Sequence, residues 1–239
     1  MTLKAVGFDL FGTLLQAEGD RTTCLENLHE TLSNSGLRIS RDKFLDIYND
    51  VHANFRVVRT TSHKEISSRL ELSEILRRLG FNVNSDSSPI PEAVEAYFSS
   101  WTVKTFEGVE ATLRNLRGRF KIGVVTNFTD NVFVYKCLTE LKLLALLDCV
   151  IISAEVGWRK PSHKIFKRFI QLTRAAIGDT LFIGDDVNSD ILGAKAVGFK
   201  TALLNRENDN KEAKYVVQPD FVLSSITELE RIVDGINGM

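Results

Sequence analysis

The first fifteen residues constrain the fold of this chain more than any other stretch. Residues 4–8 form a short apolar run that ends abruptly on the carboxylate of Asp9. An apolar, partly β-branched stretch followed by a glycine, here Gly12, is typical of a buried strand. A carboxylate directly after such a strand lies at the rim of the sheet, where it can face a crevice. An aspartate after a strand also starts many ordinary turns, so Asp9 alone leaves both interpretations open.

Three later stretches repeat this design. Polar side chains suited to chemistry follow each apolar run: Thr126 and Asn127 after 121–125, Lys160 after 149–152, and Asp185, Asp186 and Asp190 after 180–184. Helical patterns separate the runs, and strands that alternate with helices imply a parallel sheet with helices on both faces. Ligands bind outside the carboxyl ends of the strands in such sheets. We therefore predict an α/β, three-layer Rossmann-like core in which these side chains meet Asp9 at one edge.

The stretch that follows the first strand has a different pattern. Apolar residues recur there at helical spacing in four stripes, within residues 25–32, 44–58, 66–79 and 94–101. No strand pattern is visible among them, and helical stripes of this kind usually pack into a core. We therefore predict two domains: a catalytic core of residues 1–15 and 105–239, and an inserted α-helical cap of residues 16–104.

Composition narrows the class of protein. The 239 residues are 44% apolar and 26% charged, as in ordinary globular proteins. A net charge of −1 gives no electrostatic footprint for nucleic acid, and the apolar runs are far shorter than a membrane span. The three cysteines are widely spaced and fit neither a disulfide framework nor a zinc site. We expect a cytoplasmic protein with reduced thiols and no nucleic-acid or membrane partner.

Taken in order, these stretches resemble the motifs of the haloacid dehalogenase superfamily of hydrolases. The matching segments are Phe8-Asp9-Leu10-Phe11-Gly12-Thr13, Val125-Thr126-Asn127, Lys160-Pro161, and residues 184–190 from Gly184 to Asp190. The resemblance implies a Rossmann-like core, a helical cap inserted after the first motif, and a covalent intermediate on Asp9.

The resemblance also implies a role for each matching residue. It makes Lys160 the residue that orients and neutralises the nucleophile Asp9. It implies that the transferring group of the substrate is bound by Thr126, Asn127, Gly12 and Thr13. It implies that a magnesium ion is coordinated by Asp9, Asp185, Asp190 and the backbone carbonyl of Phe11.

Electrostatics favours such an ion on separate grounds. Two carboxylates about 5 Å apart repel each other by about 3 kcal/mol at an effective dielectric constant near 20. With Asp9, Asp185 and Asp190 converging, the single charge of Lys160 cannot offset all of this repulsion. Mg²⁺ binds carboxylate and phosphate oxygens and would spread the charge on a transferring phosphoryl group.

One position departs from the phosphatase pattern. Phosphatases of this family usually carry a second aspartate two residues after the nucleophile, as general acid and base, and this chain has Phe11 there. A phenyl ring cannot protonate a leaving alkoxide, and the loss of such a group typically costs about 10²–10⁴-fold in rate. The haloacid dehalogenases carry an aromatic residue at this point, because halide leaves without a proton. They lack a metal and the acidic residue that corresponds to Asp185.

The two motifs therefore favour different reactions, and we give the metal motif more weight. The favoured function is a Mg²⁺-dependent phosphatase that acts on a small, anionic phosphorylated metabolite. The first alternative is a metal-independent 2-haloacid dehalogenase, which Phe11 favours. The second is a binding or interaction protein that keeps the fold without turnover. The sequence indicates neither the substrate nor the oligomeric state.

Some nearby polar residues have two interpretations. Asp186 is favoured as a solvated turn residue over a metal ligand. Arg159 either lines the mouth of the cleft or lies on an exposed loop. For Arg56, Arg59 and His63, a solvated basic face is favoured over contact with an anionic substrate.

Overall fold

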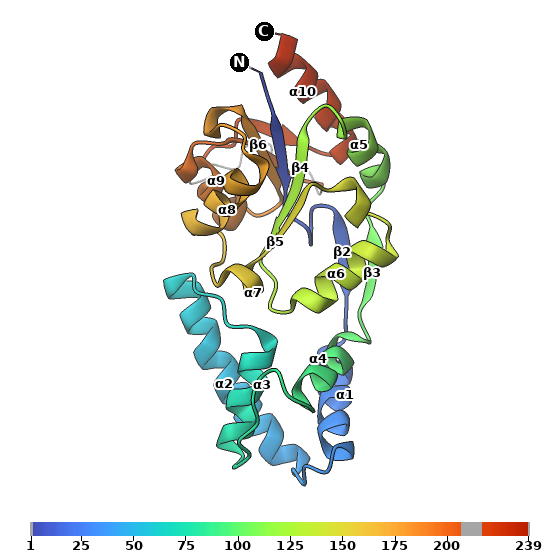
Figure 1. Cartoon of the computed structure of the whole chain (residues 1–239), viewed down its shortest axis with the longest axis vertical. Coiled ribbons are helices and arrows are strands. Elements are labelled where there is room, and N and C mark those ends of the chain that lie inside the picture. The colour runs from blue at the N-terminus through green and yellow to red at the C-terminus, as the bar shows by residue number, and fades with distance from the viewer. Residues whose placement is uncertain (1, 207–216, 239) are drawn as a thin grey trace.

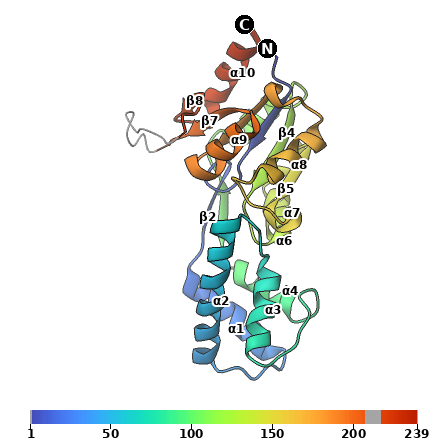
Figure 2. The same cartoon turned by 90° about the vertical axis from the view of Figure 1, so that its left-hand side faces the viewer.

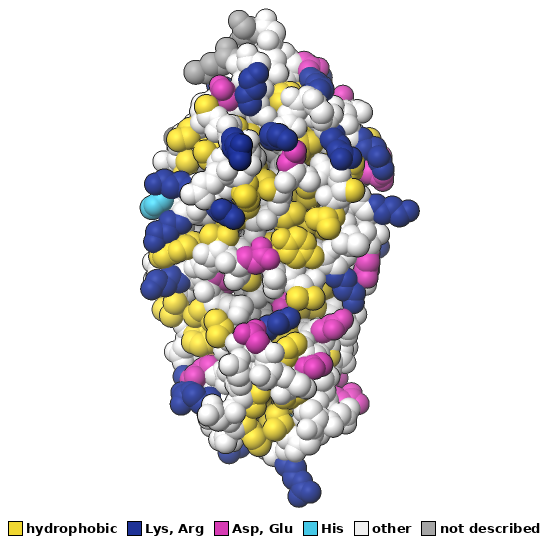
Figure 3. All heavy atoms as spheres, viewed as in Figure 1, with side chains coloured by type: hydrophobic (Ala, Val, Ile, Leu, Met, Phe, Trp, Pro, Cys, Tyr) yellow, Lys and Arg dark blue, Asp and Glu magenta, His cyan; other side chains and the backbone are white. Residues whose placement is uncertain are grey.

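The computed structural model describes residues 2–206 and 217–238, which form an α/β body and a helical body at opposite ends of an elongated molecule (Figures 1 and 2). Within these residues no helix combines the length and apolarity needed to cross a membrane. Charged side chains of both signs are spread over the face seen in Figure 3, with hydrophobic side chains between them.

The α/β body is built on a six-stranded parallel sheet with the order β5-β4-β1-β6-β7-β8. Its strands are β1 (Ala5–Phe8), β4 (Lys121–Thr126), β5 (Cys149–Ile152), β6 (Thr180–Gly184), β7 (Lys200–Leu204) and β8 (Phe221–Leu223). Phe8 lies opposite Val124 of β4 on one side and Ile183 of β6 on the other. Asp9 therefore leaves the sheet near the middle of its carboxyl edge.

Side chains that alternate along the strands cover both faces of the sheet. Val6 and Phe8 pack with α5, α6 and α10, whereas Ala5 packs with α8 and α9. The helices on the first face are α5 (Val109–Leu116), α6 (Asn131–Glu140) and α10 (Leu229–Gly238), and those on the second are α8 (His163–Thr173) and α9 (Leu192–Val197). Short helical segments complete this body: η1 (Leu144–Leu146), α7 (Ser153–Val156), η2 (Ile177–Asp179), η3 (Val187–Ile191) and η4 (Ile226–Glu228). The predicted three-layer α/β fold is confirmed.

The helical body has a hydrophobic core of its own. It consists of α1 (Arg21–Asn34), α2 (Arg41–Ser62), α3 (Ser68–Arg78) and α4 (Ile90–Phe98). Leu32, Phe44 and Leu76 are fully buried at its centre. Because three of these helices contribute a residue to that centre, the apolar stripes of the sequence face one another.

Two short strands join the bodies. β2 (Leu15–Glu18) pairs antiparallel with β3 (Thr102–Thr105), so the chain enters and leaves the helical body side by side (Figure 1). The expectation that residues 16–104 contain no strand is therefore wrong. Each strand has four residues, and β3 reads Thr-Val-Lys-Thr with no fully buried side chain. Such a strand carries too little apolar alternation to be recognised, and its partner is more than eighty residues away.

Candidate active site

The loop after β1 is shaped by close approach to a carboxylate. Asp9 N donates a 2.8 Å hydrogen bond to Ile183 O, which extends the β1–β6 pairing by one residue. Gly12 follows with φ of +93°, and a Cβ at this position would overlap the Asp185 carboxylate. Thr13 Oγ1 donates a 2.8 Å hydrogen bond to Asp185 Oδ1. The glycine thus leaves room for Asp185, and the threonine hydroxyl orients it.

Three carboxylates converge at this edge. Asp9, Asp185 and Asp190 each offer one oxygen, and these oxygens lie within 4.8 Å of one another. Gly184 gives Asp190 its space, because a Cβ there would overlap the Asp190 side chain. Asp186 N also donates to Asp190 Oδ2 at 3.1 Å. An all-oxygen set of this kind has the chemistry to hold a hard divalent cation.

Lys160 pairs with two of these carboxylates. Its ammonium group forms ion pairs with Asp9 and with Asp190, the latter at 2.7 Å, and its side chain is only 2% exposed. Asn127 positions the backbone that carries it: Lys160 N donates to Asn127 Oδ1 at 2.7 Å, and Asn127 Nδ2 donates to Lys160 O at 3.1 Å.

The charges of the cluster do not balance. Burial, together with the charges of Asp190 and Asp185, raises the pKa of Asp9 to about 8 against the attraction of Lys160. Burial also raises the pKa of Asp190. Burial alone would lower the pKa of Lys160, but the two carboxylates outweigh it and hold that pKa above its usual value. Lys160 therefore stays charged, and an additional cation would favour the ionised form of Asp9.

The remaining predicted residues lie close by. Thr126 is buried at the end of β4, opposite Ile152 of β5. The Asn127 side chain holds the main chain of Lys160, which the sequence did not indicate. Asp186 Oδ1 accepts hydrogen bonds from the backbone of residues 188 and 189 at 2.7 and 3.0 Å. This cap at the start of η3 agrees with the interpretation of Asp186 as a turn residue.

Arg206 joins the site although sequence reasoning did not single it out. It follows β7, and its guanidinium donates to the backbone carbonyls of Gly12 and Thr13, the second at 2.5 Å. The same group lies 3.5 Å from the ring centroid of Phe106. Arg206 is more than 190 residues from the loop that it clamps, so its position after a strand end is the single local signal that could have found it.

Phe11 belongs to an aromatic cluster of Phe11, Phe98, Trp101, Phe128 and Phe133. The ring of Phe11 lies 4.8 Å from that of Phe128, measured between centroids. Phe128 in turn lies 5.3 Å from Phe98, a residue of α4. The cluster therefore connects the loop after β1 with the helical body.

A cavity of about 260 Å³ lies between the two bodies. The α/β body lines it with Asn127, Phe128, Thr129 and Arg159, and the helical body lines it with residues of α1–α4 and with Trp101. Asn127 is both a wall of this cavity and the support of Lys160. A small molecule in the cavity would therefore lie beside the site.

Arg59 is buried near this cavity, so the predicted solvated basic face is wrong for this residue. Arg59 Nε lies 3.2 Å from Glu65 Oε1, and Arg59 Nη2 lies 2.5 Å from Glu71 Oε2. Arg159 binds the same Glu65 from the α/β body. The helical pattern of α2 indicates which face is polar but not what covers that face. Here Glu65 and Glu71, which lie outside α2, pair with Arg59, which is buried.

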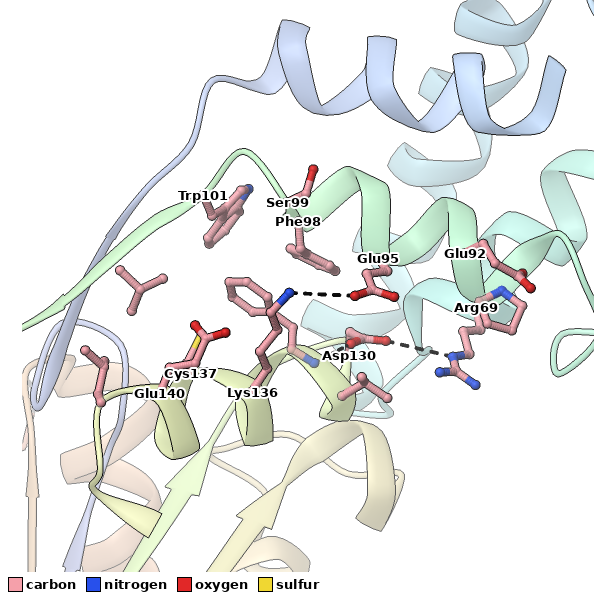
Figure 4. A pocket seen from close by; sticks show the side chains of 15 residues that line it. Arg69, Glu92, Glu95, Phe98, Ser99, Trp101, Asp130, Lys136, Cys137 and Glu140 are labelled. Atoms are coloured by element: carbon pink, nitrogen blue, oxygen red, sulfur yellow. Dashed lines mark hydrogen bonds and ion pairs between the residues drawn. The ribbon is translucent and has the colours of Figure 1, made fainter. Parts of the chain in front are cut away.

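A second cavity, of about 430 Å³, lies between α4 and α6 on another side of the aromatic cluster (Figure 4). Two ion pairs lie at its edge, Lys136 with Glu95 at 3.6 Å and Arg69 with Asp130 at 3.9 Å. None of the side chains that line it in the described residues belongs to the carboxylate cluster or to Lys160. The same is true of the smaller cavity, but that cavity is lined by Asn127, whose side chain holds the main chain of Lys160, and by Arg159, which directly precedes Lys160. The smaller cavity is therefore the candidate substrate cavity.

A central parallel strand that ends on a buried carboxylate, with a lysine and two further carboxylates at the same edge, defines a class of hydrolases. The sequence model of that family, described as haloacid dehalogenase-like hydrolase, matches residues 8–204. The chain belongs to this family and is a hydrolase, which confirms the resemblance seen in the motifs.

Individual relatives carry different names. The chain is 33% identical over 154 residues to haloacid dehalogenase-like hydrolase domain-containing protein 3 of Bos taurus, an alignment that covers 63% of this chain but only 61% of that relative. It is 23% identical to a glyceraldehyde 3-phosphate phosphatase of Pyrococcus furiosus, with 99% and 95% covered. A crystal structure of a 2-haloacid dehalogenase from Pseudomonas syringae shares the fold, with a TM-score of 0.73, 21% identity and 98% and 100% coverage.

Proposed function

We propose that this protein is a Mg²⁺-dependent phosphatase that acts on a small phosphorylated metabolite through a covalent intermediate on Asp9. The observation that carries the proposal is the charge of the site, where Asp9, Asp185 and Asp190 face the single ammonium group of Lys160. A metal-independent reaction of an anionic substrate would leave this repulsion without relief. The name of the Pyrococcus relative supports a phosphorylated substrate.

Each residue of the site has its own role in the proposed mechanism. Asp9, Asp185, Asp190 and the Phe11 carbonyl would hold Mg²⁺, which when bound neutralises charge on the transferring phosphoryl group. Lys160 pairs with Asp9 and so favours the carboxylate, which is the nucleophilic form. Thr13 keeps Asp185 in place through its hydroxyl. We keep Thr126, Asn127, Gly12 and Thr13 as proposed contacts of the transferring group.

The helical body is proposed as the cap. Residues 16–104 would form this domain, and residues 1–15 and 105–239 would form the catalytic core. The cavity of about 260 Å³ between them is of a size for a small metabolite and is closed on one side by the cap. Such a cover excludes water from the site during transfer.

Phosphate release tests this proposal. Release of inorganic phosphate is measured from four candidate substrates, each with Mg²⁺ and with EDTA. These substrates are acetyl phosphate, pyrophosphate, p-nitrophenyl phosphate and glycerol 3-phosphate. The expected result is release from at least one compound that requires Mg²⁺ and that is abolished by Asp9→Asn, which keeps the shape of the side chain but not its nucleophilic oxygen. Absence of Mg²⁺-dependent release from every compound would overturn the proposal.

A second candidate function is a 2-haloacid dehalogenase. Phe11 favours it, because a halide departs without a proton and needs no acid two residues after Asp9. This reaction would be independent of metal. Chloride release from 2-chloropropionate that persists in EDTA and disappears in Asp9→Asn would establish it in place of the phosphatase.

A further inference from the structure

The surroundings of Asp9 offer no obvious proton donor to a leaving group. Within the described residues, the charged side chains that act most strongly on Asp9 are Lys160, Asp190 and Asp185. Lys160 is held between two carboxylates, and Asp185 accepts the hydroxyl of Thr13. Both Asp185 and Asp190 belong to the oxygen set proposed for the metal, so their oxygens face that cation rather than a leaving group.

The side of the loop nearest the cap is apolar instead. Phe11 lies two residues after Asp9, and its ring packs 4.8 Å from Phe128 and 6.4 Å from Phe133, between centroids. The groups packed against the Phe11 ring are thus phenyl rings, which carry no exchangeable proton. Phe11 is thus part of the packing that joins core and cap, and it cannot exchange a proton.

This arrangement restricts the first chemical step. When an Asp9 oxygen bonds to phosphorus and the P–O bond of the substrate breaks, the leaving oxygen keeps the electron pair. An alkoxide formed in this way is a strong base and needs a proton in the transition state. A carboxylate or a phosphate is a weak base and leaves without one.

We propose that the substrates of this enzyme are anhydrides of phosphoric acid, either acyl phosphates or phosphoanhydrides, whose leaving oxygen departs as a stable anion. The proposal rests on the proposed phosphatase function and narrows its substrate class. Arg159 lines the substrate cavity directly before Lys160 in the chain, and its guanidinium pairs there with Glu65. Alcohol phosphates would be poor substrates even where they fit the cavity.

The second chemical step is affected in the same way. Water adds its oxygen to the phosphorus of the aspartyl phosphate, Asp9 is released as a carboxylate, and the proton passes to solvent. Phe11 cannot take this proton from the attacking water. The aspartyl phosphate of wild-type enzyme should therefore accumulate during turnover of an activated substrate.

The first measurement is the dependence of kcat/KM on the leaving group, made on wild-type protein with Mg²⁺. We expect the better of acetyl phosphate and pyrophosphate to exceed glycerol 3-phosphate by about 10²-fold or more, and p-nitrophenyl phosphate to exceed phenyl phosphate. Preference for acetyl phosphate identifies the acyl class, and preference for pyrophosphate identifies the phosphoanhydride class. Glycerol 3-phosphate turned over as fast as the anhydrides would overturn this inference while the phosphatase function stands. No Mg²⁺-dependent release from any compound would overturn both.

A rapid-mixing experiment with p-nitrophenyl phosphate tests the second step. We expect a burst of nitrophenolate close to one equivalent of enzyme, followed by slower steady release. Release that is linear from the first turnover contradicts the slow second step.

A matched pair of variants tests Phe11 itself. Phe11→Asp supplies a proton-exchanging group, and Phe11→Asn supplies the same shape without one. We expect the aspartate variant to raise kcat/KM for glycerol 3-phosphate by about 10²-fold over the asparagine variant, with acetyl phosphate changed by less than a few-fold between them. Equal rates of the two folded variants on glycerol 3-phosphate would overturn the inference. If neither variant folds, the leaving-group series on the wild-type protein decides it.

Discussion

Asn127 and Lys160 hold each other through two reciprocal hydrogen bonds, from Lys160 N to Asn127 Oδ1 at 2.7 Å and from Asn127 Nδ2 to Lys160 O at 3.1 Å. Lys160 lies in neither a strand nor a helix. Its backbone is therefore fixed by a side chain from the end of β4, and the reach of its ammonium group to Asp9 depends on that side chain.

Replacement of Asn127 should accordingly impair both catalysis and stability. Asn127→Ala removes both hydrogen bonds, which are worth about 1 kcal/mol each, and it frees the backbone of Lys160. We expect a loss of about 2 kcal/mol in the free energy of unfolding and a fall in kcat of at least about tenfold, because a misplaced Lys160 no longer pairs well with Asp9. Denaturant unfolding and steady-state kinetics measure the two effects.

Asn131→Ala is the matched control for this variant. Asn131 Nδ2 donates a 3.1 Å hydrogen bond to Glu155 near the surface, away from Lys160. The control should keep kcat within a few-fold of wild type. An Asn127→Ala protein with unchanged kcat would show that Lys160 is positioned by other contacts.

A comparison of Gly12→Ala with Gly36→Ala should separate the effect of backbone strain from that of displacing the Asp185 carboxylate. Gly12 and Gly36 have nearly the same φ, +93° and +95°, but a Cβ at Gly12 would overlap Asp185 whereas a Cβ at Gly36 has nothing within 4 Å. Alanine at either position costs about 1–2 kcal/mol from the left-handed backbone. We expect Gly12→Ala alone to lose, in addition, the Mg²⁺-dependent rise in melting temperature. Equal Mg²⁺ responses of the two variants would contradict a metal site that includes Asp185.

The sequence located the core of this site because parallel strands bring their carboxyl ends to one edge. Asp9, Asp185 and Asp190 could be predicted to lie at one edge because they follow strands of a parallel sheet, and the structure brings one oxygen of each within 4.8 Å of the others. The clamp of Arg206 on Gly12 and Thr13 could not be predicted, because its contacts are to backbone carbonyls and leave no pattern of residue types. The strands β2 and β3 were missed for a similar reason. Their pairing is long-range, and four residues are too few to show a period.

The way in which the stability of the helical body changes at acidic pH should depend on Glu71. Burial alone would raise the pKa of Glu71, but the hydrogen bond from His52 and the charge of Arg59 outweigh it, so this pKa lies below its ordinary value. A carboxylate whose pKa is lower in the folded state stabilises the protein above its unfolded pKa and loses this effect as the pH falls through the folded value. We expect Glu71→Gln to cost about 3 kcal/mol at pH 7, the low end for a broken buried pair, because Arg59 keeps Glu65. The cost should shrink toward zero at pH values below the folded pKa of Glu71, as followed by denaturant unfolding.

Glu74 on the same helix provides the control for that measurement. It pairs with Arg77 and Arg78 near the surface, where ion pairs contribute about 0–1 kcal/mol. Glu74→Gln should therefore change the free energy of unfolding at pH 7 by less than Glu71→Gln does. A pH-independent cost for Glu71→Gln would mean that its carboxylate charge contributes nothing.

The segment before Lys160 is anchored on the helical body, and this anchor gives the last prediction. Arg159 N donates to His63 O at 2.8 Å, and Glu65 N donates to Gly157 O at 3.0 Å. The side chains of Arg159 and Glu65 form an ion pair across the same junction. These contacts connect residues 63–65 to the segment that leads into Lys160.

A double-mutant cycle on Glu65→Gln and Arg159→Met measures this connection. Because either single change already breaks the ion pair, the second change has no pair left to break. We therefore expect the double variant to be more stable than the sum of the single losses predicts, by about 1–3 kcal/mol. The same non-additivity should appear in kcat, since both single changes loosen the junction next to Lys160. Additive effects on kcat together with coupled effects on stability would show that the pair holds the two bodies together without influencing the lysine.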